Sequence, residues 1–93
     1  MSNNLIVSYD LNVEGQKYEA VIERIKSLGA WARVQKSVWY LSTDSATQQV
    51  ADMVRNVMDS NDSLLVVNAS KNEASWYGVS DDIGFFVKDQ WAK

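Results

Sequence analysis

The chain of 93 residues offers few side chains that could carry out chemistry. It contains no histidine and no cysteine, which excludes thiol nucleophiles, Cys/His zinc sites and catalysis by Ser-His or Cys-His pairs. The serines at positions 8, 37 and 42 therefore have no histidine to activate them, and no lysine spacing indicates a serine–lysine pair. Any reaction would depend on carboxylates, hydroxyls, lysines or a hard metal ion.

Asp10 is the candidate catalytic and metal-binding residue. It ends a predicted strand, and we expect it on the sheet face that the helices leave open. Beside a two-fold axis it would meet its own copy, and two such carboxylates could share Mg²⁺ or Mn²⁺, with water completing the shell. The alternative is that Asp10 begins a turn or caps a backbone amide. Asp81 and Asp82 resemble a metal pair, but helix capping explains them more simply.

The strand that must position Asp10 is predicted by alternation over residues 5–11. Leu5, Val7, Tyr9 and Leu11 share one face, and Ile6, Ser8 and Asp10 share the other. Gly15 marks the loop that follows. Apolar residues at steps of three and four then predict an amphipathic helix over residues 18–28, and Gly29 fits a left-handed cap at its end.

The rest of the chain continues this alternation of elements. Residues 30–41 predict two short strands joined by a tight hairpin. A second amphipathic helix follows, with Ser45 and Gln48 at the spacing of a capping box. Residues 64–67 form an apolar strand after a polar turn at 59–62. Residues 75–78 fit a short edge strand, and a third short helix is predicted from Ser80 to the C-terminus.

This order, β-α-β-β-α-β with a C-terminal strand/helix appendage, predicts a single α+β domain over residues 1–93 with a ferredoxin-like sandwich. Both long helices would cover one face of a four-stranded antiparallel sheet. The fourth strand is apolar on both faces, and Ile6 and either Trp39 or Tyr40 should point away from the helices. A second copy, the C-terminal helix or a ligand must then cover the open face. We expect a homodimer.

A further set of residues carries a family resemblance. The strand ends in Ser8-Tyr9-Asp10, the helix closes at Gly29, and Arg33-Val34-Gln35-Lys36-Ser37-Val38-Trp39 follows. Over roughly the first two-thirds of the chain this resembles the small CRISPR-associated endoribonuclease family, the minor partner of the spacer integrase, and its virulence-associated protein D relatives. The resemblance implies a ferredoxin-like fold and dimers formed through the sheets. It also implies a metal-binding role for Asp10, and maps Arg33, Gln35 and Ser37 onto the family's strand-two pattern.

Charge and tryptophan content bear on the partners. The chain has 9 basic and 12 acidic residues, and its net charge of −3 disfavours nucleic acid. Arg33, Lys36 and Lys71 could form a small basic rim for phosphates, or could simply be solvated.

Of the four tryptophans, we expect those at positions 31 and 91 in the core and Trp39 or Trp76 at an interface.

The leading hypothesis is a cytoplasmic, homodimeric protein that binds another protein and has no strong catalytic activity. The absence of cysteine fits a reducing compartment, and no segment is long and apolar enough to suggest a membrane partner. The first alternative is a nuclease that depends on Mg²⁺ or Mn²⁺ and uses an Asp10 pair across the dimer, and the second is a small toxin or inhibitor. The predicted interface residues are Ile6, Ser8, Arg33, Gln35, Ser37, Trp39 and Trp76.

Overall fold

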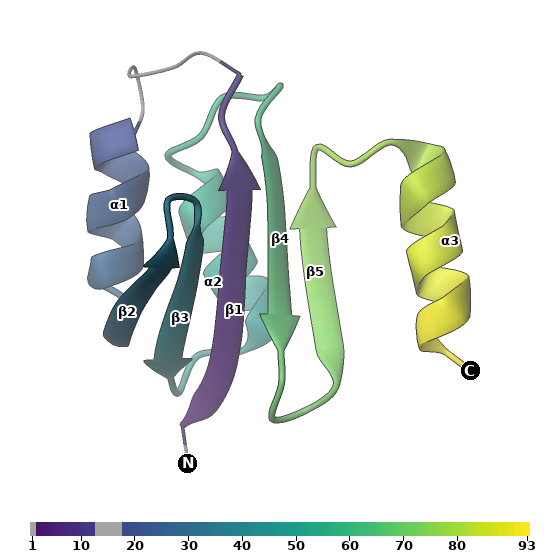
Figure 1. Ribbon diagram of the computed structural model, residues 1–93, viewed down its shortest axis with the longest axis horizontal. Helices are drawn as coiled ribbons and strands as arrows, with labels where there is room; N and C mark the ends of the chain where they lie inside the picture. Colours follow the sequence, from purple (N-terminus) through teal and green to yellow (C-terminus); the bar gives the residue numbers. More distant parts are fainter. Residues whose placement is uncertain (1, 13–17) are drawn as a thin grey trace.

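The computed structural model describes residues 2–12 and 18–93. Within them the elements in chain order are β1 (Asn3–Asp10), α1 (Tyr18–Lys26), β2 (Ala30–Gln35), β3 (Val38–Thr43), α2 (Thr47–Arg55), β4 (Ser63–Asn68), β5 (Glu73–Tyr77) and α3 (Asp81–Trp91). The strands form one sheet in the order β2-β3-β1-β4-β5, and every neighbouring pair is antiparallel. Helices α1 and α2 lie behind this sheet in Figure 1. The α+β class expected from the sequence is confirmed.

Strand β1 lies at the centre of the sheet, between β3 and β4. Its burial alternates along its length, with Leu5, Val7 and Tyr9 buried and Ile6 and Asp10 exposed. Alternate side chains of a strand point to opposite faces, so this pattern places one face of β1 against the core. The two faces predicted for residues 5–10 are confirmed, whereas Leu11, expected in the strand, lies just beyond its end.

The core fills the space between the sheet and the two long helices. Helix α1 contributes Val21 and Ile25, and α2 contributes Val50 and Val54, all without exposed surface. Their spacing of four residues brings each pair onto one side of its helix, facing the sheet. The amphipathic helices predicted from the sequence are therefore both present and both turned towards the core.

Two local predictions are wrong. Gly29 does not adopt a left-handed conformation, because Gly78 is the glycine with positive φ among the described residues. Glycine is instead required at position 29 by close approach, since a Cβ there would lie 2.1 Å from the carbonyl oxygen of Ser42. The capping box does not form either, because α2 begins at Thr47 after Ala46, which offers no side-chain cap. The loop predicted at Gly15 lies outside the described residues.

The C-terminal segment extends the sheet. Strand β5 pairs along β4, so the sheet has five described strands where the sequence suggested four and an appendage. The edge strand predicted around residues 75–78 is confirmed, with bounds Glu73–Tyr77. Helix α3 then runs beside the outer edge of β5, apart from α1 and α2 (Figure 1). In residues 2–12 and 18–93, no helix has the length and apolar content needed to cross a membrane.

The distribution of the tryptophans corrects the expectation from the sequence. Trp39 is completely buried in the core and does not lie at a surface. Trp31 and Trp91, expected in the core, are 46% and 40% exposed. The reason is register and position: Trp39 pairs with Val7, whose side chain faces the helices, whereas Trp31 lies on the fully exposed edge strand β2 and Trp91 lies on α3, which buries no residue.

Candidate binding site on the uncovered sheet face

No helix or strand of residues 2–12 and 18–93 lies over the centre of the sheet face opposite α1 and α2 (Figure 1). The strand registers and the alternation of buried and exposed residues show which side chains lie on this face. The residues of this face, from β2 across to β5, are Ala30, Ala32, Gln35, Val38, Tyr40, Ser42, Asn4, Ile6, Ser8, Asp10, Ser63, Leu65, Val67, Ala74 and Trp76. We call this set the open face.

Apolar side chains occupy the centre of the open face. Ile6 pairs with Tyr40 on one side and Val67 on the other, and Leu65 pairs with Ser8 and Trp76. Ile6 and Leu65 are therefore diagonal neighbours on adjacent strands, close enough for their side chains to contact. They remain 37% and 38% exposed, so two apolar side chains face solvent at the middle of the sheet.

The open face is nearly free of charge. Asp10 is the one charged residue in the set above, and none of its members is a lysine or an arginine. Phosphate groups are held mainly by basic side chains and backbone amides. The chemistry of the open face therefore suits an apolar protein surface better than a nucleic-acid backbone.

Asp10 lies at the end of β1, opposite Ser63, and is exposed. Among residues 2–12 and 18–93, no three acidic side chains gather closely enough to hold a metal ion. Asp10 therefore belongs to no three-ligand acidic group among these residues, and a hard cation such as Mg²⁺ would need further oxygen ligands from water or from a second copy. Asp81 and Asp82 lie in the first turn of α3, where negative charge favours the helix dipole.

The other predicted interface residues do not all share the open face. Ile6, Ser8, Gln35 and Trp76 belong to it, by the registers given above. Trp39 is in the core, and Arg33 pairs with it on the helix side of the sheet. Ser37 lies in the turn between β2 and β3, where its carbonyl accepts a 3.1 Å bond from the amide of Tyr9. The structure thus brings together part of the predicted set and separates the rest.

Arg33 has a structural role in the β2–β3 hairpin. Its Nε and terminal nitrogen donate to the carbonyl of Lys36 at 3.2 and 2.8 Å. Its guanidinium lies 5.3 Å from the centroid of the Trp39 ring, within range of a cation–π interaction. These contacts close the tight turn and explain why a hairpin forms there without an Asn-Gly or Asp-Gly pair.

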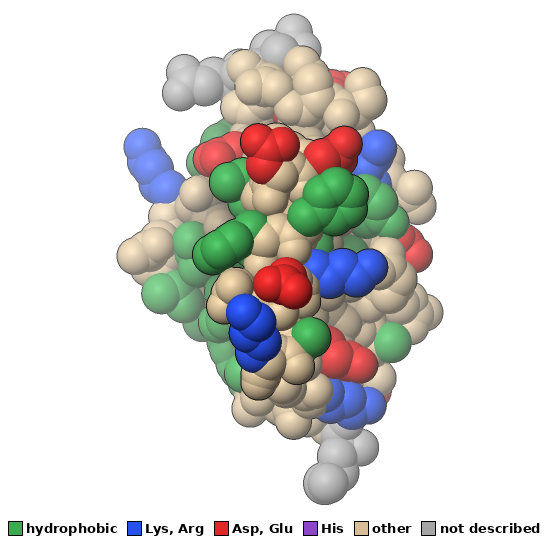
Figure 2. Space-filling view, turned by 90° about the vertical axis from the view of Figure 1, so that its right-hand side faces the viewer, with side chains coloured by type: hydrophobic (Ala, Val, Ile, Leu, Met, Phe, Trp, Pro, Cys, Tyr) green, Lys and Arg blue, Asp and Glu red, His purple; other side chains and the backbone are tan. Residues whose placement is uncertain are grey.

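Helix α3 borders the open face at the β5 edge. The Trp76 side chain belongs to the open face, and a Cβ on Gly84 would lie 3.2 Å from its indole nitrogen. Beyond this contact α3 exposes large apolar side chains, with Ile83, Phe85 and Phe86 between 55% and 72% exposed. Figure 2 faces this helix and shows apolar side chains interspersed with acidic and basic groups.

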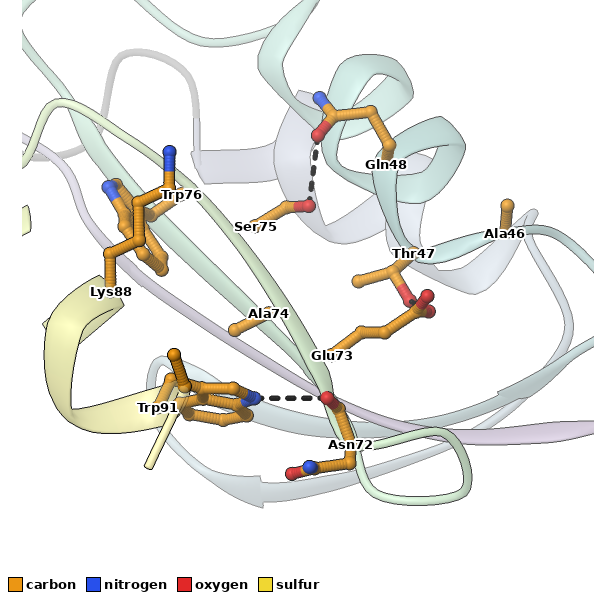
Figure 3. A pocket seen from close by; sticks show the side chains of 11 residues that line it. Ala46, Thr47, Gln48, Asn72, Glu73, Ala74, Ser75, Trp76, Lys88 and Trp91 are labelled. Carbon is orange, nitrogen blue, oxygen red and sulfur yellow. Dashed lines mark hydrogen bonds between the residues drawn. The ribbon is translucent and has the colours of Figure 1, made fainter.

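A cleft between β5 and α3 was not predicted from the sequence. It has a volume of about 610 Å³ and is lined by β5, by the start of α2 and by the inner side of α3. Its lining residues are Ala46, Thr47, Gln48, Asn72, Glu73, Ala74, Ser75, Trp76, Lys88, Trp91 and Ala92 (Figure 3). The available signal was the alternation of polar and apolar residues from Glu73 to Trp76, but the cleft also depends on where α3 lies.

A polar cluster that shares Gln48 and Ser75 with the cleft ties β5 to α2. The Tyr77 hydroxyl donates a 2.5 Å hydrogen bond to Asp52 Oδ1, and the Gln48 amide donates to the same oxygen at 2.9 Å. The bond from Tyr77, followed by that from Gln48, lowers the pKa of Asp52. The same interaction with Asp52 raises the pKa of Tyr77. Gln48 also accepts from the Ser75 hydroxyl at 2.9 Å, so the cluster fixes β5 as the fifth strand.

Comparison of the chain with protein-family models, curated proteins and solved structures finds no significant match. The open face, Asp10 and the cleft are therefore the features of the chain that point to a function.

Proposed function

We propose that the protein is a ferredoxin-like homodimer that joins two copies through the open face and acts by binding a partner protein, without strong catalysis. The observation that carries this proposal is the exposure of Ile6 and Leu65 at the centre of an almost uncharged sheet face. The order β2-β3-β1-β4 with two helices on one side supports the ferredoxin-like arrangement.

Self-complementarity supports a second copy as the occupant. A two-fold interface brings the same surface of both chains together, so a charged patch would meet its own like charge. The open face avoids this at its centre, where the apolar pair Ile6 and Leu65 is flanked by small or neutral residues such as Ser8. The single charge, Asp10, lies at the end of its strand.

The size of the sheet also supports a stable contact. Five strands about 4.8 Å apart and about 20 Å long give a flat projection of roughly 500 Å², and side-chain relief makes the accessible area larger. Specific complexes bury about 600–1,000 Å² on each partner. The open face is therefore near the lower end of the required range.

The resemblance to the CRISPR-associated endoribonuclease and virulence-associated protein D families supports the same proposal. What supports it here is the order of elements and the exposed Asp10 at the end of the first strand. On this view the cytoplasmic protein keeps the dimeric architecture and uses it mainly for protein binding.

A nuclease with Asp10 as its metal ligand is the second candidate, because Asp10 is exposed and a two-fold axis beside the end of β1, instead of at the centre of the open face, would supply a second carboxylate. The absence of lysine and arginine from the open face argues against it. An assay for RNA and DNA cleavage with Mg²⁺ or Mn²⁺ separates the two functions. We expect no cleavage, whereas metal-dependent cleavage that disappears in Asp10→Ala would support the nuclease. A toxin or inhibitor would instead capture one specific host enzyme in a pull-down.

Sedimentation velocity on a charged variant tests the proposed dimer. Leu65→Glu places a carboxylate at the centre of the open face, where it would meet its copy, so we expect a monomer at micromolar concentration. Phe85→Glu is the matched control, because Phe85 is a more exposed apolar residue that lies on α3. We expect the native chain and this control to sediment as dimers. A native monomer, or dissociation by Phe85→Glu alone, would contradict the proposal.

A further inference from the structure

Strand β5 presents unpaired backbone groups at its outer edge. The Ala69 amide donates to the Asn4 carbonyl at 2.8 Å, while the Asn4 amide donates to the Ser70 hydroxyl. The first bond places residues 4 and 69 at a hydrogen-bonded position of the ladder between β1 and the chain just after β4. Hydrogen-bonded pairs alternate along an antiparallel ladder. It follows from the registers that β4 bonds to β5 at residues 73, 75 and 77. The N–H and C=O groups of Ala74 and Trp76 therefore point outward, away from the sheet.

The cleft beside α3 runs along this same edge. Its lining includes five consecutive residues, from Asn72 to Trp76. Because successive side chains of a strand point to opposite faces, a cleft that contacts all five must extend along the edge between the faces. The outward backbone groups of Ala74 and Trp76 are therefore accessible from it. One neighbouring group is already used, since Trp91 Nε1 donates a 3.0 Å bond to the Asn72 carbonyl.

The two sides of the cleft differ in chemistry, as Figure 3 shows. Towards α3 lie Trp76, Trp91 and Ala74, which make an apolar side. Towards α2 lie the polar side chains Gln48 and Glu73, the latter bonded to the Thr47 hydroxyl at 3.0 Å. An extended segment would present alternate side chains to these two sides.

We propose that the edge of β5 binds an extended peptide as an additional antiparallel strand, with apolar side chains towards Trp76 and Trp91 and basic side chains towards Glu73. Antiparallel pairing matches the rest of the sheet and is the more stable arrangement. Main-chain bonds to Ala74 and Trp76 would provide affinity, and the two sides of the cleft would provide selectivity. The cleft volume of about 610 Å³ accommodates a segment of several residues.

The choice of a basic partner follows from charge. The protein carries a net charge of −3, and the Glu73 carboxylate lies on the polar side of the cleft. Lys88 is on the opposite side beside Trp76, where its methylene chain adds apolar surface while the ammonium group can stay in water. This inference rests on the proposed binding role, but it uses the edge of β5, and dimerisation uses the centre of the open face.

A heptapeptide of alternating valine and lysine, blocked at both ends, is the probe. Calorimetric titration of the full chain is expected to show binding. In the proposed antiparallel pairing the valines share a face with Ala74 and direct their N–H groups at β5, whereas the lysine N–H groups point away. N-methylation of the valines should therefore abolish binding, and N-methylation of the lysines should leave it within about threefold. No binding of the unmodified peptide at millimolar concentration, or equal binding of both methylated forms, would overturn the proposal.

Two variants of the protein complete the test. Ala74→Pro removes an outward donor from an edge strand, where proline is tolerated, and should weaken binding at least tenfold. Glu73→Lys should weaken binding of the valine–lysine peptide about tenfold and favour a valine–glutamate peptide. Sedimentation of both variants reports dimerisation separately, so loss of the peptide and loss of the dimer are distinguishable. Unchanged affinity in both variants would overturn the proposal.

Discussion

The indole nitrogen of Trp39 donates a 3.2 Å hydrogen bond to the hydroxyl of Tyr9 within the core. The two residues lie on adjacent strands, β3 and β1, and both side chains face the helices. This bond satisfies the one polar group that a buried tryptophan brings into an apolar interior. It explains how β3 can bury the largest side chain of the core.

Removal of this acceptor should destabilise the fold. Tyr9→Phe leaves the Trp39 N–H without a partner, and an unsatisfied buried donor costs about 1–3 kcal/mol. Tyr40→Phe is the matched control, because the Tyr40 hydroxyl bonds to Asn4 Oδ1 at an exposed position and should cost less than about 1 kcal/mol. Urea denaturation measures both. Equal losses of unfolding free energy in the two variants would show that the buried Trp39–Tyr9 bond stabilises the fold no more than the exposed Tyr40–Asn4 bond.

Tyr9 should also govern stability at alkaline pH. Burial raises the pKa of Tyr9 above its ordinary value of 10.0. The native state therefore binds this proton more tightly than the unfolded state. The stabilisation of the native state by protonated Tyr9 is fully present below about pH 10 and is lost as the pH rises further. The unfolding free energy of the native chain should fall more steeply above about pH 10 than that of Tyr9→Phe, and parallel curves would contradict this assignment.

The Asp52–Tyr77 bond should make the stability of the fold decrease at acid pH, whereas Tyr9 should make it decrease at alkaline pH. The Tyr77 hydroxyl lowers the pKa of Asp52, so the stabilisation is present above the ordinary aspartate pKa near 3.9 and is lost as the pH falls below it. Melting temperatures of the native chain should drop more between pH 6 and pH 3 than those of Asp52→Asn. Asp89→Asn, which removes an exposed carboxylate on α3, should melt in parallel with the native chain. If the melting temperatures of Asp89→Asn differ from those of the native chain as much as those of Asp52→Asn do, the effect comes from the loss of any negative charge and the Asp52–Tyr77 bond is not its cause.

Two glycines should respond differently to alanine. Gly78 has φ of 72°, and a Cβ there would lie 2.1 Å from the Asp62 carbonyl, so Gly78→Ala should cost more than about 1 kcal/mol. Gly84 lies in α3, where a Cβ would lie 3.2 Å from Trp76. Helix α3 buries no residue, and alanine favours a helix by about 1 kcal/mol. The helix preference of alanine and the tight contact with Trp76 oppose each other, so Gly84→Ala should leave the unfolding free energy nearly unchanged in chemical denaturation. If Gly84→Ala lowered the unfolding free energy more than Gly78→Ala, the prediction would be contradicted.

The sequence predicted the elements well because periodicity is a local property. The two faces of β1 and the buried stripes of α1 and α2 follow directly from the spacing of residues such as Val7, Val21 and Val50. The choice between Trp39 and Tyr40 for the core could not be made in this way. It depends on the register of β3 against β1, which pairs Trp39 with Val7 and Tyr40 with Ile6.

The candidate site was predictable in part for the same reason. Ile6, Ser8 and Asp10 were assigned to the open side of β1 by alternation, and the structure has them there. The cleft was missed because it requires α3 to lie beside β5, and that placement depends on contacts between distant residues. The approach of Gly84 to Trp76 and the bond from Trp91 to Asn72 provide these contacts.

An isotope-filtered NMR experiment tests the proposed sheet-face dimer most directly. Mixed samples of ¹³C-labelled and unlabelled chains report only contacts between different copies. We predict intermolecular NOEs from the methyl groups of Ile6 and Leu65, which are 37% and 38% exposed at the centre of the open face. A sample with no intermolecular NOEs, or with NOEs confined to the exposed side chains of α3, would contradict the dimer.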